Sequence, residues 1–91
     1  MAAARFLAVD LGASSGRLVA GAWDGARFAL EEVHRFPNGP VRCGAHWHTD
    51  VRALWAETRK GFAAFAARSG GGPEAVGVDS WGVDYGLLGR D

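Results

Sequence analysis

A carboxylate and a short glycine-containing turn near the start of the sequence could hold a metal-bound polyphosphate. Asp10 ends an apolar run, and residues 11–17 then read Leu-Gly-Ala-Ser-Ser-Gly-Arg. Glycines let backbone N–H groups approach phosphate oxygens, serine hydroxyls add hydrogen bonds, and Arg17 supplies positive charge. Asp10 can hold Mg²⁺ directly or through water. The alternative is an ordinary hairpin turn whose serines satisfy only the turn backbone.

A second group of polar and aromatic residues stands near the other end of the sequence. Asp79 and Asp84 flank Trp81 and Gly82. An aromatic face beside carboxylate acceptors suits a ligand with many hydroxyl groups, because the ring packs against its carbon skeleton. In the alternative interpretation, Asp79 caps the turn after a strand and Trp81 packs in the core.

The three histidines and the single cysteine do not form a metal-binding pattern. His46 and His48 would share one side of a strand, but neither they nor His34 have a carboxylate or thiol at ligand spacing. We therefore expect ordinary surface or hydrogen-bonded histidines. Cys43 permits no internal disulfide, and its neighbours do not indicate a reactive thiol.

Three strands must position the first of these groups. The pattern predicts an antiparallel meander with strands at residues 6–9, 17–23 and 27–35. A glycine-containing turn over 11–16 joins the first two strands, and Asp24-Gly25 is a typical two-residue hairpin turn. Prolines and glycine over 37–40 end the third strand.

A helix and a fourth strand must position the second group. Residues 49–69 follow a helical period, with Thr49 as the predicted N-cap and glycines from Gly70 as the stop. Gly61 inside this helix costs about 1 kcal/mol relative to alanine, so we expect a packing reason for it. A fourth strand is predicted at 75–78, and 81–88 is too irregular to assign. One helical face should carry these residues: Val51, Leu54, Trp55, Thr58, Phe62 and Phe65.

Composition narrows the class of protein. The chain has 91 residues, the size of one small domain or of part of a larger one. Its formal net charge of +0 lacks the basic excess of proteins that bind nucleic acid or anionic membranes. The longest apolar run, 62–67, is too short to cross a bilayer, and Asp10 interrupts the only candidate leader. We expect a soluble, cytoplasmic protein.

Three stretches of the sequence, in order, resemble the amino-terminal part of rhamnulokinases, in the sugar-kinase family that includes glycerol kinase and xylulokinase. The first, 8–17, is typical of the wider superfamily of sugar kinases, actins and chaperone ATPases. The second reads His-Arg-Phe-Pro-Asn-Gly from His34, and the third reads Asp-Ser-Trp-Gly-Val-Asp-Tyr-Gly from Asp79. These two make the chain rhamnulokinase-like, and the resemblance extends from about Phe6 to Asp91.

The resemblance implies an α/β, actin-like (ribonuclease-H-like) fold, with residues 1–91 as an incomplete part of the first lobe and the second lobe absent. It implies transfer of the γ-phosphoryl group of ATP to the 1-hydroxyl of L-rhamnulose, with Mg²⁺ as cofactor. Asp10 would face the magnesium–phosphate region, and Gly82 would contact the sugar, near Asp79, Trp81 and Asp84. The loop around the ATP phosphates would consist of Ala13, Ser14, Ser15, Gly16 and Arg17.

The sequence departs from this family at two places. Rhamnulokinases usually read His-Trp-Asp before the helix, whereas residues 46–50 here read His-Trp-His-Thr-Asp, which leaves the helix start open. Ser80 replaces a usual threonine and keeps the hydroxyl. The family's general base, an aspartate far downstream, lies outside this chain, so we expect no kinase turnover from the 91 residues alone.

Two other functions fit the same residues. One is a related kinase that acts on xylulose, fuculose, glycerol or gluconate, since it would share the chemistry of residues 10–17. The other is a non-catalytic, actin-like nucleotide-binding module, which would have no need of the Trp81–Asp84 segment. Sugar-dependent enhancement of nucleotide binding separates the kinases from the module.

Overall fold

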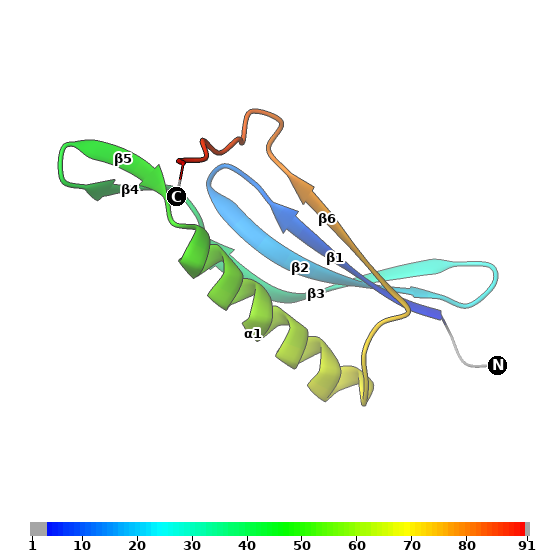
Figure 1. The fold of residues 1–91 in the computed structure, drawn as a ribbon. Helices are drawn as coiled ribbons and strands as arrows, with labels where there is room; N and C mark the ends of the chain where they lie inside the picture. Colours follow the sequence, from blue (N-terminus) through cyan, green and yellow to red (C-terminus); the bar gives the residue numbers. More distant parts are fainter. Residues whose placement is uncertain (1–3, 91) are drawn as a thin grey trace.

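The computed structural model describes residues 4–90 and shows a mixed sheet with one helix on one of its faces (Figure 1). Each strand of the sheet is close to its predicted position, although the predicted boundaries were too short. The elements in chain order are β1 (Ala4–Leu11), β2 (Ser15–Trp23), β3 (Phe28–Pro37), β4 (Pro40–Cys43), β5 (His46–Thr49), α1 (Val51–Ser69) and β6 (Ala75–Ser80).

The main sheet has the strand order β3-β2-β1-β6. The first three strands form the predicted antiparallel meander, and β6 lies parallel to β1 after the chain has crossed over through α1 (Figure 1). A parallel neighbour requires such a crossover, because a short turn can join only antiparallel strands. The α/β class with three antiparallel strands, a helix and a further strand is therefore confirmed.

The core lies between α1 and one face of the sheet. In β1 the alternating residues Leu7 and Val9 are buried and face the helix, while Phe6 and Ala8 lie on the opposite face. Phe65 of α1 is buried against them. The remaining buried apolar residues of this core are Leu18, Val33 and Phe36.

The helical face that carries the predicted apolar residues is only partly buried. Thr58 and Phe65 are buried, whereas Val51 and Trp55 are 68% and 57% exposed. The reason is that α1 packs mainly on β2 and β3, so the apolar stripe is wider than the surface beneath it. Gly61 has the packing reason that we expected, because a Cβ there would lie 2.5 Å from Leu18 Cδ2.

The start of the helix also differs from the prediction. Asp50, not Thr49, is the N-cap, and its Oδ1 accepts a hydrogen bond of 3.0 Å from the Ala53 amide. Thr49 lies one residue earlier, as the last residue of β5, a strand that the sequence did not predict. β4 and β5 form a small hairpin around Gly44, which has a φ of 63°. All eight residues of these strands are exposed, so they lack the alternation of buried and exposed positions that identifies a strand.

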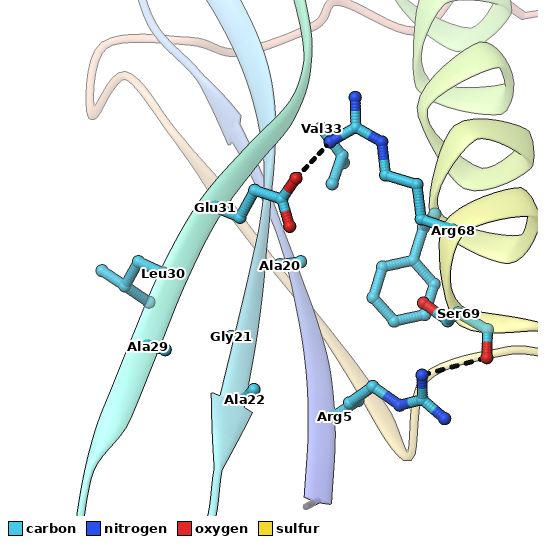
Figure 2. Close-up of a pocket in the computed structure, with 11 residues that line it drawn as sticks. Arg5, Ala20, Gly21, Ala22, Ala29, Leu30, Glu31, Val33, Arg68 and Ser69 are labelled. Atoms are coloured by element: carbon cyan, nitrogen blue, oxygen red, sulfur yellow. Dashed lines mark hydrogen bonds and ion pairs between the residues drawn. The ribbon is translucent and has the colours of Figure 1, made fainter.

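The end of the helix is as predicted, and two arginines attach it to the sheet. Gly70 adopts a left-handed conformation, with a φ of 75°, and its amide donates to the Ala66 carbonyl. Arg68 pairs with Glu31 of β3 at 2.7 Å, and an Arg5 nitrogen donates to the Ser69 carbonyl at 2.9 Å (Figure 2). The small hollow between them is lined on the sheet side by residues of β2 and β3, among them Ala20, Gly21 and Ala29.

The opposite face of the sheet and all of β6 carry exposed apolar side chains. Leu30 is 72% exposed and Val78 is 69% exposed. The helix and the last strand therefore leave apolar surface exposed in this chain. Within residues 4–90, no helical stretch is long and apolar enough to span a membrane.

Candidate functional site

The predicted phosphate loop is the hairpin turn between β1 and β2. The Gly12 amide donates to the Ser15 carbonyl at 2.9 Å and closes the end of the hairpin, so Ala13 and Ser14 stand exposed at its tip. Gly16 is buried because the ring of Phe36 lies where a side chain would be; a Cβ at this position would be 2.2 Å from Phe36 Cζ. Glycine thus lets the turn lie close to β3 without displacing the core.

Asp10 and Arg17 form an ion pair at the base of this turn. They are directly opposite each other in the β1–β2 ladder, and Arg17 Nε donates to Asp10 Oδ2 at 3.0 Å. The two side chains are 39% and 43% exposed, so both remain accessible to a ligand. The guanidinium can therefore turn from the carboxylate towards an incoming phosphate, since its five N–H donors serve either anion.

Parallel pairing of β1 and β6 places a second carboxylate beside Asp10. Asp79 is the register partner of Asp10, and both line one hollow on the sheet face away from α1. Two carboxylates with room for water and phosphate oxygens fit Mg²⁺, which usually binds one or two protein carboxylates beside phosphates. Within the described part of the chain, no three His, Cys, Asp or Glu side chains gather into a complete set of ligands.

The segment after β6 folds back towards the hairpin turn. The Trp81 amide donates to the Leu11 carbonyl at 3.1 Å, and the Asp84 amide donates to the Trp81 carbonyl at 2.9 Å. Trp81 is 55% exposed, which excludes the interpretation that it packs in the core of this chain. Gly82 is exposed within the turn from Trp81 to Asp84.

The two predicted groups meet at a cavity of about 200 Å³. Its walls come from the phosphate-loop turn, the Trp81–Asp84 turn and the chain around β4 and β5. The lining residues are Gly12, Ala13, Asn38, Gly39, Pro40, Thr49, Trp81 and Asp84. Gly82 lies between two of these residues in sequence but is not itself in the lining. An aromatic ring, a carboxylate, a hydroxyl and an amide around one small cavity suit a polar ligand of sugar size.

Asn38 is a site residue for which the sequence predicts only a break after the third strand. Its Nδ2 donates to the Gly12 carbonyl at 2.7 Å, and its own amide donates to the Ser14 carbonyl at 3.0 Å. One signal was present in the sequence, because Asn38 belongs to the His-Arg-Phe-Pro-Asn-Gly stretch that carries the family resemblance. The contact itself joins residues 26 positions apart, which local patterns do not reveal.

The histidines lie away from this cavity. His34 Nε2 is 2.6 Å from Glu57 Oε2, and this bond, followed by the one from Lys60, holds the Glu57 pKa below its usual value of 4.5. The pair links β3 to α1 and confirms a hydrogen-bonded histidine at this position. His46 and His48 stand on exposed β5 with their rings 6.3 Å apart. Cys43 is exposed at the end of β4.

Comparison with curated proteins shows similarity to rhamnulokinases along nearly the whole chain. The rhamnulokinase of Bacteroides thetaiotaomicron is 43% identical over 86 residues, which are 94% of this chain and 18% of that protein. That of Pectobacterium atrosepticum is 42% identical over 93 residues, covering 100% of this chain and 18% of that protein. That of Lactiplantibacillus plantarum is 41% identical over 86 residues, covering 94% and 17%.

The chain therefore spans less than a fifth of the length of these relatives. No protein-family model matches it. The resemblance that the three motif-bearing stretches indicated is nevertheless confirmed, and it associates the chain with the sugar kinases.

Proposed function

From the similarity to rhamnulokinases over 94% of the chain, we propose that these residues are the start of an actin-like first lobe in a cytoplasmic, ATP-dependent carbohydrate kinase. The longer protein would phosphorylate L-rhamnulose and yield L-rhamnulose 1-phosphate. The observation that carries the proposal is the shared cavity, where the phosphate-loop turn meets the Trp81–Asp84 turn.

In this proposal the β1–β2 turn holds the phosphate tail of ATP. The loop would use the backbone amides and hydroxyls of residues 13–16, together with the guanidinium of Arg17. Asp10 and Asp79 would hold Mg²⁺, which supplies charge neutralisation on the phosphates when it is bound. Arg17 already contacts Asp10 at 3.0 Å, so the positive charge lies where a phosphate oxygen would arrive.

The sugar would lie in the cavity on the other side of the same turn. Trp81 can cover the carbon skeleton while Asp84 and Thr49 meet hydroxyl groups, and the backbone at Gly82 leaves room for close approach. Phosphoryl transfer depends mainly on positioning and on electrostatic stabilisation. These residues position both reactants but include no assigned general base, which the family resemblance puts downstream.

A chimera tests the proposal. The 86 matched residues of the Bacteroides thetaiotaomicron rhamnulokinase are replaced by those of this chain, and sugar-dependent ADP formation is measured with L-rhamnulose, xylulose, fuculose, glycerol and gluconate. We expect turnover with L-rhamnulose and at least about tenfold lower kcat/KM with the other sugars, a difference of about 1.4 kcal/mol in transition-state binding.

Three further results complete the test. The unmodified 91-residue chain should show no turnover above a buffer blank, because it offers only one side of the cleft. A folded chimera that prefers another sugar contradicts the rhamnulose assignment. A folded chimera that binds ATP without any enhancement by sugar supports a non-catalytic nucleotide-binding module instead.

A further inference from the structure

Asn38 holds two carbonyl groups of the phosphate-loop turn, those of Gly12 and Ser14. Its side-chain Nδ2 reaches the Gly12 oxygen at 2.7 Å, and its backbone amide reaches the Ser14 oxygen at 3.0 Å. In a two-residue hairpin loop, the carbonyl of the residue before the loop commonly accepts from the amide of the residue after it. Here these would be the Gly12 carbonyl and the Ser15 amide. The Gly12 carbonyl accepts instead from the Asn38 side chain, so the shape of this turn depends on a residue from outside it.

These two bonds also fix where the turn directs its amides. The C=O and N–H groups of a trans peptide point in opposite directions, and no cis peptide occurs among residues 4–90. With the Gly12 and Ser14 oxygens turned towards Asn38, the amides of Ala13 and Ser15 are directed away from it. The orientation of two donors of the predicted phosphate loop is therefore set by Asn38.

Asn38 is itself held in place, so it can act as a rigid support. Its Oδ1 accepts from the Gly39 amide at 2.9 Å, and the preceding residue, Pro37, pairs with Ser15 in the β2–β3 ladder. The side chain is half-buried and also lines the cavity opposite Trp81 and Asp84. One residue thus touches both the turn proposed to hold phosphate and the cavity proposed to hold sugar.

We infer that Asn38 is a positioning residue. It orients the amides of the phosphate-loop turn towards the nucleotide and holds this turn in a fixed position relative to the cavity proposed to hold the sugar. This inference rests on the proposed function. Asn38 is not proposed to contact the phosphates itself; it affects them by holding the Gly12 and Ser14 carbonyls and so orienting the turn.

The test uses the active chimera with Asn38→Asp and Asn38→Ala. Asn38→Asp preserves size and the bond from Gly39 but places a carboxylate oxygen against the Gly12 carbonyl; Asn38→Ala removes the side chain. We expect both variants to raise the KM for MgATP and lower kcat/KM for it by about 10–100-fold, because misplacing reacting groups has effects of this size. The KM for the sugar should change less than the KM for MgATP, because Asn38 is one of several residues that line the sugar cavity. Glu32→Gln, an exchange of similar size at an exposed position of β3, the strand that precedes Asn38, is the matched control.

Amide hydrogen exchange separates positioning from general loss of structure. We expect faster exchange at the Gly12 amide, whose hydrogen bond to the Ser15 carbonyl closes the turn, in both variants, with unchanged exchange in β1 and the same thermal midpoint within a few degrees. Unchanged MgATP kinetics, an equal loss for both substrates, or unfolding of both variants would overturn the inference. If the parent chimera binds no ATP at all, the proposed function fails; unaltered exchange at the turn in the variants refutes the Asn38 contact independently.

Discussion

Two pairs of polar side chains, one at the candidate site and one away from it, are formed before any ligand arrives. Asp10 and Arg17 pair at 3.0 Å across two strands, and His34 and Glu57 pair at 2.6 Å between a strand and the helix. Both pairs are partly exposed, so each can exchange its partner for water or a ligand. Their consequences differ because the first lies beside the proposed phosphate site, whereas the second joins β3 to α1.

The second pair makes stability depend on pH in the acid range. The Glu57 pKa in the folded chain is lower than its usual value of 4.5, chiefly because of the hydrogen bond with His34. The stabilisation is therefore complete above about pH 4.5 and is lost as the pH falls through the lower, folded pKa. We expect Glu57→Gln to lose this part of the acid dependence when the thermal midpoint of the chain is followed by circular dichroism.

A second variant checks the cause of that dependence. His34→Gln removes the main reason for the lowered Glu57 pKa and should flatten the same part of the stability profile. If both variants retain the acid dependence of the unchanged chain, other carboxylates cause it.

At the scale of elements, the distance of closest approach between α1 and the sheet is set by one glycine. Gly61 faces Leu18 of β2, and Leu18 is 0% exposed, so its side chain has no space into which to move. Helix propensity alone would favour alanine at this position by about 1 kcal/mol. At the contact between Gly61 and Leu18, the requirement for close packing of the helix on the sheet has therefore outweighed the helix propensity of alanine.

This contact predicts that Gly61→Ala lowers the free energy of unfolding by about 1–2 kcal/mol, since overpacking usually costs more than the propensity gain. The measurement is denaturant unfolding, in this chain or in the chimera. In a Leu18→Ala background the same exchange should become neutral or stabilising, because the obstructing side chain is gone. Equal effects in the two backgrounds would show that Leu18 is not the cause.

The same scale explains the unpredicted hairpin. β4 and β5 add a wall to the candidate cavity through Pro40 and Thr49, although none of their residues is buried. The position of this hairpin depends on its two neighbours in sequence, because β3 ends just before β4 and α1 begins just after β5. Strands of four exposed residues have no burial pattern from which to predict them.

At the scale of the whole molecule, one face of the sheet is covered and the other is not. The core lies beneath α1, while Leu30 on the other face and all of the edge strand β6 are exposed. Large exposed apolar surface promotes association in water. We propose that residues beyond these 91, in a protein as long as the relatives, cover this face.

A charge on the uncovered face should therefore suppress association without unfolding the chain. We expect Leu30→Glu to change the free energy of unfolding by less than about 0.5 kcal/mol, as for other exposed sites, while reducing dye binding and self-association. Sedimentation velocity and fluorescence of an apolar-surface dye provide the measurement. Leu7→Glu, at a position that is 2% exposed, is the contrasting control and should unfold the chain. A monomeric chain with little dye binding before any substitution would contradict the prediction.

The sequence by itself determined the features that depend on neighbouring residues. Alternation and turn chemistry predicted the meander, the helical period predicted α1, and Gly70 predicted its end, because each pattern acts within a few positions. The motif-bearing stretches also indicated the similarity to rhamnulokinases, which the comparisons confirmed.

Only the tertiary structure decided which distant residues meet. The parallel pairing that places Asp79 beside Asp10 depends on the crossover through α1, and the reach of Asn38 to Gly12 depends on β3 lying against β2. The exposure of Trp81 depends on which surfaces the sheet leaves uncovered. Such contacts follow from the packing of whole elements, whose energy is shared among many residues and is therefore absent from any local pattern.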